Sequence, residues 1–424
     1  MKNILLVNPW IYDFSAYDFG MKPVGLLRVG EYLRRNGNRV CLLDCLSGCA
    51  KSRDERGFSK IRKEKIECPE VLKTIERPYF RYGISLSDFL SKLEEIKDVD
   101  EIFVTSGMTY WYPGVRLAIK FLRERFRKTP IILGGIYATL CHKHAVLTSG
   151  ADMVCKGDYV GKKYFLEPGF YPAYDLLADK EILPIQLTSG CPFKCSYCAS
   201  KILSPRFEMR DPVDLFEEVM HYNKAFGTNG LVFYDDALTC RSQDGIKKFL
   251  RLVAASGAAF TFHTPNGLHA RYIDEELAEL FKKANFRDLR LSLETSDSDL
   301  QDFTGGKVTN QDLKLALRNL KEAGYNKSDL GVYILMGAGW LDMENTMKDI
   351  FFVNSLGAKA VLASYSPIPG TLDYTALVKA GIIERGLDPL WHNKTIFAEL
   401  LMPSYVKQVS QIRRFAANLN KTSP

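Results

Sequence analysis

Short apolar runs alternate with amphipathic segments along the first part of the chain. The apolar runs predict strands, and hydrophobic positions spaced three or four apart predict helices between them, at Val24–Asn36 and Val115–Arg127. Strands separated by helices form parallel sheets covered on both faces, so the pattern predicts a doubly wound, flavodoxin-like sheet that binds ligands at the carboxyl ends of its strands. The predicted strands are Asn3–Asn8, Arg39–Asp44, Glu101–Ser106, Pro130–Leu133 and Ala151–Cys155.

A second series of strands and helices follows and predicts a different architecture. Six apolar strands with helical segments between them indicate a partial (β/α)6 barrel, whose chemistry takes place where the loops after each strand converge. The predicted strands are Ile182–Thr188, Gly230–Tyr234, Ala259–His263, Asp288–Leu293, Gly331–Met336 and Ala360–Ser364. The predicted helices are Pro212–Phe226, Asp274–Lys283, Asn310–Ala323 and Met343–Leu356.

The two series divide the chain into predicted domains. Residues 1–162 form the sheet domain, and residues 163–180 form a linker rich in glycine, proline and aromatic residues. Residues 181–375 form the barrel, and residues 376–424 form a C-terminal helical extension. Within the first domain, the basic stretch Lys51–Arg77 is predicted to be a solvated excursion.

Composition narrows the classes of protein to consider. The chain has 424 residues, 46% of them hydrophobic and 25% charged, as in ordinary globular proteins. A net charge of +7 suits an anionic cofactor or substrate and is too small to predict nucleic-acid binding. Neither a signal peptide nor an apolar run long enough to cross a membrane is present, so we expect a cytoplasmic protein. Ten cysteines in a reducing compartment direct attention to metal binding.

Three of these cysteines form a CxxxCxxC motif directly after the first predicted barrel strand: Cys191, Cys195 and Cys198. Such close spacing lets one loop supply three thiolates to a [4Fe–4S] cluster and leaves the fourth iron without a protein ligand. The alternatives are a zinc site that lacks one ligand, or three incidental cysteines. Zinc sites favour paired CxxC units and a fourth cysteine or histidine nearby, and neither occurs here.

The motif and the six βα units that follow resemble the radical SAM superfamily. The resemblance implies that the open iron binds S-adenosylmethionine (SAM), which is reductively cleaved to methionine and a 5′-deoxyadenosyl radical. It also implies a one-electron reductant such as flavodoxin or ferredoxin. Tyr197 stands where the family usually places an aromatic residue against adenine.

Other SAM-binding positions are implied by weaker resemblances at later strand ends. Asp235 and Asp236 end the second barrel strand, where the family often binds the methionyl amine; a solvated acidic pair is the alternative. Ser292 and Glu294 end the fourth strand and are candidates for polar parts of SAM. The family's Gly-x-Pro-Gly-Glu after the fifth strand is replaced by Gly337–Leu341, a departure at that loop.

The third barrel strand ends in Thr-Phe-His-Thr-Pro-Asn-Gly, which offers two substrate candidates, His263 and Asn266. A histidine at such a position is otherwise a hydrogen-bonded core group. The substrate, a small molecule or a peptide, is not identified by any pattern, and no catalytic residue is assigned.

Glycine-containing turns of the N-terminal domain resemble the cobalamin-binding domain that precedes the barrel in one branch of the superfamily. The segments that carry this resemblance are Pro23–Leu27, Thr105–Thr109, Gly134–Thr139 and Gly150–Asp158, and the candidate contacts are Ser106, Thr109, Gly134 and Gly135. No histidine precedes His142, so the motif that supplies an axial imidazole to cobalt in classical cobalamin domains is absent. The resemblance implies cobalamin without an imidazole on its lower face; a domain retained for substrate docking is the alternative.

Three functions are compatible with these sequence patterns. The first is a cobalamin-dependent radical SAM enzyme, such as a methyltransferase that acts on an unactivated carbon. The second is a radical SAM enzyme without cobalamin that performs a rearrangement, cyclisation or oxidation. The third is a non-catalytic iron–sulfur scaffold. A second cysteine group, Cys41, Cys45 and Cys49, is either another cluster or a set of small buried residues.

Overall fold

The computed structural model describes residues 1–50, 53–54, 58–338, 342–401 and 405–421. The chain divides into two compact units. The first comprises Met1–Lys180 together with Gly386–Asn393, and the second comprises Glu181–Arg385 together with Lys394–Pro424. Residues 339–341 of the predicted departure at Gly337–Leu341 lie outside the described residues.

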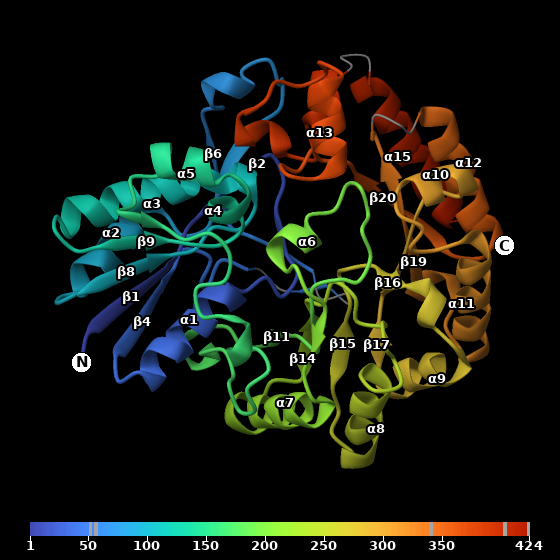
Figure 1. Cartoon of the computed structure of the whole chain (residues 1–424), viewed down its shortest axis with the longest axis horizontal. Coiled ribbons are helices and arrows are strands. Elements are labelled where there is room, and N and C mark those ends of the chain that lie inside the picture. Colours follow the sequence, from blue (N-terminus) through green and yellow to red (C-terminus); the bar gives the residue numbers. More distant parts are fainter. Residues whose placement is uncertain (51–52, 55–57, 339–341, 402–404, 422–424) are drawn as a thin grey trace. The chain divides into compact units, whose positions relative to one another are not determined.

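The first unit contains a five-stranded parallel sheet with the order β10-β9-β8-β1-β4 (Figure 1). Strand β1, which lies inside this sheet between β8 and β4, is almost entirely buried, because helices cover both faces and its side chains on either face are apolar. The predicted doubly wound sheet is confirmed. The strands are β1 (Asn3–Asn8), β4 (Arg39–Asp44), β8 (Glu101–Val104), β9 (Ile131–Leu133) and β10 (Met153–Val154). The helices are α1 (Val24–Arg35), α2 (Leu86–Glu95), α3 (Tyr112–Arg125), α4 (Ile136–Leu140) and α5 (His142–Thr148).

The strand order places a switch point between β1 and β8. These strands are neighbours, yet the chain continues from β1 to β4 on one side and from β8 to β9 on the other. The loops that leave the two carboxyl ends therefore diverge and open a crevice between them.

The basic stretch after β4 is more ordered than predicted. Within its described part, β6 (Lys63–Ile66) pairs with β7 (Tyr79–Tyr82), which pairs with β2 (Ile11–Asp13) in an antiparallel sheet. Tyr79 and Tyr82 are buried, while the side chains of β6 are largely exposed. The charged side chains of β6 are solvated as predicted, but the segment that carries them is a strand of a sheet. The shorter elements are β3 (Tyr17–Asp18), β5 (Ser59–Lys60), η1 (Glu70–Leu72), η2 (Thr109–Trp111), η3 (Lys162–Tyr164) and η4 (Tyr174–Leu176).

The second unit contains two four-stranded parallel sheets, β11-β14-β15-β17 and β16-β18-β19-β20. Strands β17 and β18 are consecutive in the chain and are separated only by Asp288, whose φ of 48° interrupts extended backbone. The predicted partial barrel is confirmed. The strands are β11 (Ile182–Ile185), β14 (Gly230–Phe233), β15 (Thr261–His263), β16 (Leu268–His269), β17 (Phe286–Arg287), β18 (Leu289–Glu294), β19 (Leu330–Met336) and β20 (Lys359–Ser364).

Helices connect the barrel strands where sequence signals predict them. In α7 (Pro212–Phe226), the Asp211 carboxylate accepts a hydrogen bond from the Val213 amide, and Gly227 ends the helix at φ 71°. The other helices and short elements are α6 (Ser200–Leu203), α8 (Ile246–Ser256), η5 (Ala270–Tyr272), α9 (Glu275–Lys283), α10 (Ser298–Phe303), α11 (Asn310–Glu322), η6 (Lys327–Asp329), α12 (Met343–Ser355) and the hairpin β12 (Thr188–Ser189) and β13 (Glu208–Met209).

The C-terminal residues contribute elements to both units. Helix α15 (Tyr405–Lys421) covers the edge strand β20, and its Asn420 amide accepts a hydrogen bond from the Ala360 N–H and donates one to the Ala360 carbonyl, each at 2.9 Å. Helix η7 (Pro389–His392) instead belongs to the first unit. Helices α13 (Leu372–Lys379) and α14 (Phe397–Leu401) belong to the second. No helix among the described residues combines the length and the apolar character that a membrane span requires.

Candidate functional site

The three predicted metal ligands lie on one loop of the second unit, here called the cysteine loop (residues 190–199). The loop is held at its centre by Ser196, whose N–H donates to the Thr304 carbonyl and whose carbonyl accepts from the Asp373 N–H, each at 3.1 Å. The Cys198 N–H donates to the Cys195 carbonyl at 3.1 Å, which closes a turn between the last two cysteines. Tertiary contacts thus help to shape the loop.

The cysteines differ in exposure: Cys191 is buried, Cys195 is half-buried and Cys198 is exposed. Burial raises the pKa of the Cys191 thiol to about 11. Burial also raises the pKa of Cys195, against the opposing effect of the Lys307 ammonium. The described residues contain no group of three metal-ligating side chains that converge on a single ion. A cubane does not require such convergence, because each thiolate binds a different iron, and the three-thiol donor set fits that group.

Glycine at position 190 is required for the loop to leave β12. Its φ is 74°, and a Cβ there would lie well inside van der Waals contact with the backbone oxygen of Arg206. We predict that Gly190→Ala destabilises the second unit by about 1–3 kcal/mol and lowers iron loading after reconstitution. Gly227→Ala is the matched control. The φ of Gly227 is 71°, and a Cβ there would meet no atom within 4 Å, so this variant has the conformational strain without the collision. Chemical denaturation of both variants measures the difference, and equal losses would contradict the prediction.

Cys191 has two buried neighbours that the sequence motifs did not identify. Its sulfur lies 3.9 Å from Nε2 of His269, and it packs with Cys240 in a small buried cluster. The His269 ring stacks on Phe193 of the cysteine loop at 4.9 Å between centroids and 18° between planes. Burial, reinforced by the positive charges of Lys307 and Arg271, lowers the pKa of His269 to about 3, so the ring is neutral.

A partly buried ion pair adjoins Tyr197. Nζ of Lys307 lies 2.9 Å from Oε1 of Glu294 and 5.8 Å from the centre of the Tyr197 ring. Burial is the main cause that raises the pKa of Tyr197 far above its usual value, followed by the Glu294 charge. Glu294 ends β18 with φ 69°, which is rare outside glycine, and its buried Oε2 has no hydrogen-bond partner among the described residues. This oxygen is a free acceptor beside the cysteine loop.

The two predicted aspartates have different surroundings. Asp235 is buried, and its Oδ1 accepts from the Leu187 N–H at 3.0 Å and from the Thr188 N–H and hydroxyl at 2.5 and 2.8 Å. These bonds tie β14 to the strand that enters the cysteine loop, and burial raises the pKa of Asp235 to about 7. Asp236 is exposed, and its carboxylate interacts with the Ser200 hydroxyl at the end of the cysteine loop. Asp236 therefore keeps a carboxylate available to a ligand.

The remaining barrel candidates lie on β18, at the end of β15 and in the loop that follows β15. Ser292 is buried on β18 against Gly267, where any side chain would collide with the Ser292 hydroxyl. His263 is buried at the end of β15. Asn266 is exposed and donates through Nδ2 to the Asp235 carbonyl at 3.1 Å. Ser292 thus has a packing role, and Asn266 is the more accessible of the two substrate candidates.

In the first unit, a pocket of about 100 Å³ lies at the switch point of the sheet. It is lined by residues that follow β1 and β8, with Lys22 and Pro23 at its side; the full lining is Asn8, Pro9, Trp10, Ile11, Met21, Lys22, Pro23, Leu46, Thr105, Ser106, Gly107, Trp111 and Val115. The volume suits one arm of a large ligand rather than a whole corrin. This is the place where a doubly wound sheet binds ligands.

The predicted residues at this edge have distinct functions in the fold. The Ser106 hydroxyl donates to the Gly134 carbonyl at 2.6 Å and joins the loops after β8 and β9. Gly135 has φ 95°, and a Cβ there would collide with the Ser106 backbone. At Gly134 a Cβ would meet no atom within 4 Å, so the surface is open there. Open backbone beside the pocket fits the close approach of a flat, amide-rich ligand.

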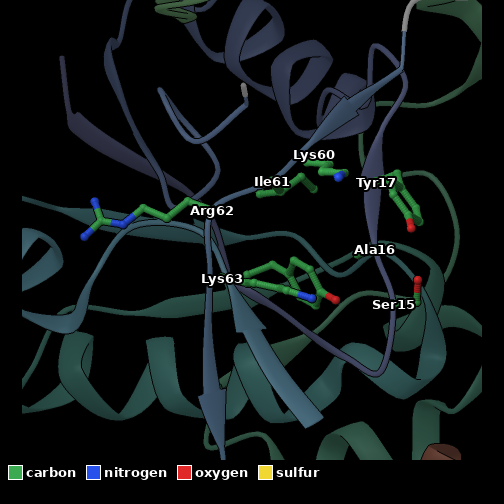
Figure 2. Close-up of a pocket in the computed structure, with 8 residues that line it drawn as sticks. Ser15, Ala16, Tyr17, Lys60, Ile61, Arg62 and Lys63 are labelled. Carbon is green, nitrogen blue, oxygen red and sulfur yellow. The ribbon is translucent and has the colours of Figure 1, made fainter. Parts of the chain in front are cut away.

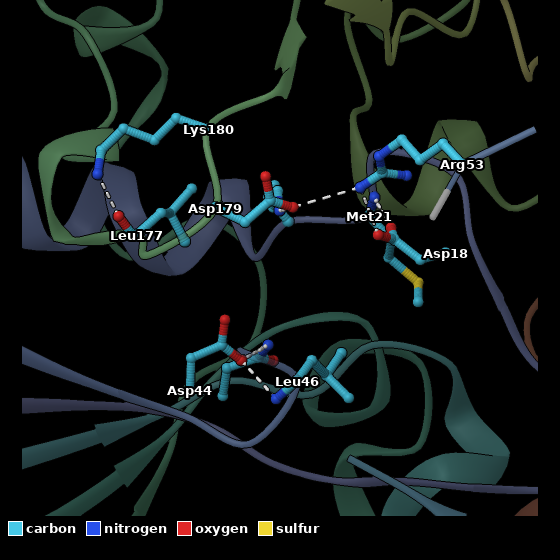
Figure 3. A network of polar contacts seen from close by, with 10 residues as sticks. Asp18, Met21, Asp44, Leu46, Arg53, Leu177, Asp179 and Lys180 are labelled. Atoms are coloured by element: carbon cyan, nitrogen blue, oxygen red, sulfur yellow. Dashed lines mark hydrogen bonds and ion pairs between the residues drawn. The ribbon is translucent and has the colours of Figure 1, made fainter. Parts of the chain in front are cut away.

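Figure 3 shows polar contacts next to the same edge. Asp44 at the end of β4 accepts from Asn8 Nδ2 at 2.7 Å and from the Leu46 N–H at 2.9 Å. Lys22, which lines the pocket, pairs with Asp179 at 2.8 Å. These contacts fix two loops of the pocket.

Helix η7 brings a histidine to this unit that sequence order did not suggest. Thr109, a predicted contact, lies with its hydroxyl 3.2 Å from Nδ1 of His392, and the sulfur of Cys141 lies 3.9 Å from the same nitrogen. Asn393 donates to Asp13 at 2.9 Å. The segment is therefore docked by several buried contacts, and no local motif could have revealed this, because it is 283 residues from Thr109.

The docked His392 makes stability sensitive to acid. Burial, with a smaller contribution from the charge of His144, lowers the pKa of His392 to about 3. In an unfolded chain the pKa of histidine is about 6.5. Because the unfolded chain binds the extra proton, stability is complete above pH 6.5 and falls by about 1.4 kcal/mol per pH unit as the pH decreases toward 3. We predict that His392→Gln lowers the free energy of unfolding at pH 7.5. Between pH 6.5 and 5, the free energy of unfolding of this variant should fall less than that of the wild type. Urea unfolding at the three pH values tests this, with exposed His221→Gln as control.

A larger pocket of about 440 Å³ lies in the antiparallel part of the first unit (Figure 2). Its lining is Ser15, Ala16, Tyr17, Lys60, Ile61, Arg62, Lys63 and Tyr82. Arg62 extends away from the other labelled side chains and pairs with Asp88 at 3.4 Å, and the Lys63 ammonium lies 3.7 Å from the centre of the Phe80 ring. Two of its cations thus already interact within the protein.

In the second cysteine group, Cys41 is exposed, whereas Cys45 and Cys49 have the surroundings of buried packing residues. Cys45 and Cys49 are buried, and the Cys49 thiol lies 3.4 Å from the Ser47 carbonyl. Burial raises the pKa of Cys41, Cys45 and Cys49. These thiols are therefore protonated at neutral pH.

Part of this chain matches a known protein family, and its fold is similar to that of a solved structure. Residues 185–350 match the sequence profile of the Radical SAM superfamily. The fold is similar to that of TsrM, a radical S-adenosylmethionine methyltransferase from Kitasatospora setae solved with cobalamin and a [4Fe–4S] cluster bound. The TM-score is 0.64 at 15% identity, over 91% of this chain and 79% of that chain.

Two curated proteins are similar in sequence. An anaerobic magnesium-protoporphyrin IX monomethyl ester cyclase of Synechocystis is 20% identical over 382 residues, 79% of this chain and 67% of the relative. An uncharacterized methyltransferase of Pyrococcus horikoshii is 26% identical over 213 residues, 47% of this chain and 44% of the relative. The chain thus spans less than half the length of the second relative.

Proposed function

We propose that this chain, whose residues 185–350 match the Radical SAM superfamily, is an enzyme that binds a [4Fe–4S] cluster through Cys191, Cys195 and Cys198 and cleaves SAM. The observation that carries the proposal is the tertiary anchoring of a three-thiol loop at Ser196, within the matched domain. The bound cluster supplies the electron that converts SAM to methionine and a 5′-deoxyadenosyl radical.

The residues around the loop have separate tasks in this proposal. Asp236 accepts hydrogen bonds from the methionyl amine of SAM, since Asp235 is already engaged by the backbone of Leu187 and Thr188. Glu294 accepts from a hydroxyl or amine of SAM through its unpaired Oε2, while Lys307 holds the other oxygen. The Tyr197 ring lies beside that ion pair and packs against adenine.

Product analysis of the reduced protein tests the proposal. Anaerobic protein with dithionite and SAM should form 5′-deoxyadenosine and methionine, even without the natural substrate. Glu294→Gln should retain iron and sulfide but raise the SAM concentration needed for half-maximal cleavage about tenfold, equivalent to about 1.4 kcal/mol. A fully loaded wild-type protein that forms no 5′-deoxyadenosine would instead support the scaffold function.

We further propose that the first unit binds cobalamin at the carboxyl edge of its sheet and that the enzyme is a methyltransferase. The pocket at the switch point and the open backbone at Gly134 support this, together with a fold similar to that of cobalamin-bound TsrM. Bound cobalamin supplies a transferable methyl group. Anaerobic purification with cobalamin, followed by absorption spectroscopy, separates this proposal from a radical SAM enzyme without cobalamin.

The histidines of the first unit support cobalamin without an imidazole on cobalt. Nδ1 of His142 lies 3.1 Å from the Ala138 carbonyl, Nδ1 of His144 lies 2.7 Å from the Tyr137 hydroxyl, and His392 is engaged by Thr109. Electron paramagnetic resonance (EPR) of the cob(II)alamin form should therefore lack nitrogen splitting from an axial imidazole. A splitting that disappears in the alanine variant of one of these histidines would contradict the proposal.

A further inference from the structure

We propose that the imidazole of His269 donates a hydrogen bond to the Cys191 thiolate when that thiolate binds the cluster, and that this bond raises the reduction potential of the cluster. The inference rests on the proposed function, because it presupposes a cluster on the cysteine loop. His269 is 78 residues from Cys191 in sequence and belongs to none of the motifs that predicted the site. It would act as a positioning and tuning residue, since it contacts a cluster ligand rather than SAM.

The geometry already places the two groups together. Nε2 of His269 lies 3.9 Å from the Cys191 sulfur, within hydrogen-bonding range for sulfur, and both residues are buried. The ring is held on its flat side by Phe193, which is two residues beyond Cys191 in the same loop. The backbone is held as well, because the Thr239 hydroxyl donates to the His269 carbonyl at 3.1 Å. The imidazole therefore does not need to move to reach the sulfur.

The position of the ring proton follows from the chemistry of the acceptor. A neutral imidazole carries one N–H, and a thiolate bound to iron can only accept a hydrogen bond. A lone pair on Nε2 would face the negative sulfur and repel it, so the cluster favours the tautomer with the proton on Nε2. Nδ1 of His269 is buried and has no hydrogen-bond partner in the described part of the chain, so nothing there competes for the proton.

The bond changes the electron affinity of the cluster. One-electron reduction adds negative charge that spreads onto the thiolate sulfurs, and a donor directed at one of them stabilises the reduced state more than the oxidised state. In this reduction the electron passes from the external one-electron reductant to the cluster, and no bond of His269 is broken. A cluster that keeps this donor is easier to reduce than one that lacks it.

Matched variants of the full-length reconstituted protein test the inference. His269→Phe removes the donor but keeps a flat ring over Phe193, whereas His269→Gln keeps an N–H at a similar reach. Midpoint potentials come from EPR-monitored redox titration, and exposed His221→Phe on α7 is the control. We expect a more negative potential in His269→Phe, with the ratio of reduced to oxidised cluster at a fixed potential lowered roughly three- to tenfold. His269→Gln should lie between this variant and the wild type, and His221→Phe should match the wild type.

Iron and sulfide content, measured first, separates the possible failures. A wild-type protein that binds no cluster would overturn the proposed function, whereas a loaded His269→Phe with the wild-type potential would overturn only the role of His269. If His269→Phe does not load, His269→Asn takes its place, because its shorter side chain withdraws the donor from Cys191. A more negative potential for asparagine than for glutamine supports the inference, and equal potentials overturn it.

Discussion

Replacing Cys195 by alanine is expected to leave a folded chain without a SAM-cleaving cluster. Three thiolates on one loop hold a cubane, and the loss of one leaves an iron without its protein ligand. Reconstituted wild-type protein should contain about four iron and four sulfide per chain, and the variant close to none. The fold should persist, because Ser196 is anchored through its backbone to Thr304 and Asp373 rather than through the neighbouring cysteines. Iron and sulfide analysis and 5′-deoxyadenosine formation measure the effect.

Two other cysteines provide matched controls for this experiment. Cys240 packs directly with Cys191 yet lies outside the CxxxCxxC motif, and Cys41 belongs to the first unit. Cys240→Ala and Cys41→Ala should load iron and cleave SAM as the wild type does. Full loading in Cys195→Ala, or complete loss in Cys240→Ala, would show that the motif has been assigned to the wrong thiols.

A phenylalanine at position 134 should abolish cobalamin binding while the protein still folds. The carboxyl edge of the sheet is open at Gly134, so a large side chain there meets no atom of the protein near its Cβ. It would instead occupy the space beside Ser106 and the pocket, where the corrin is proposed to lie. We expect at least about a hundredfold weaker binding, equivalent to about 2.7 kcal/mol. Cobalamin retained after gel filtration, quantified by absorbance, measures the loss.

The neighbouring glycine serves as the contrast. At Gly135 the φ of 95° and the close Ser106 backbone exclude any side chain, so Gly135→Ala should lower the free energy of unfolding by about 1–3 kcal/mol. Gly134→Ala should unfold like the wild type. A Gly134→Phe protein that binds cobalamin normally would place the cofactor elsewhere or exclude it, whereas an unfolded variant would show that the surface is not open.

Local sequence patterns were sufficient for most of the strands and helices. The apolar runs at Asn3–Asn8 and Arg39–Asp44 are strands with those bounds, and Pro212–Phe226 is a helix with proline in its first turn and glycine after its end. The differences lie at strand ends. The strand predicted to reach Ser106 ends at Val104, because the Ser106 hydroxyl bonds to Gly134 of the adjacent loop. Such ends depend on partners that are distant in sequence, which a periodicity cannot reveal.

The same limit applies to the candidate site. Spacing alone identified Cys191, Cys195 and Cys198, since three ligands from one loop are a local feature. Spacing could not distinguish the roles of Asp235 and Asp236. They differ because backbone N–H groups of a distant segment donate hydrogen bonds to the Asp235 carboxylate. Nor did charge alternation at β6 identify an antiparallel strand, since its pairing with β7 bridges residues far apart in sequence.

The sequence by itself therefore determined the two successions of strands and helices and the three-cysteine motif, because periodicity, capping residues and ligand spacing act over a few neighbouring positions. Only the tertiary structure decided which other groups surround these features. It placed His269 against Cys191, the Lys307–Glu294 pair beside Tyr197, and His392 against Thr109. Each of these contacts forms when a sheet closes or a distant segment docks, so its free energy depends on burial and on exact placement, neither of which any short stretch of the chain encodes.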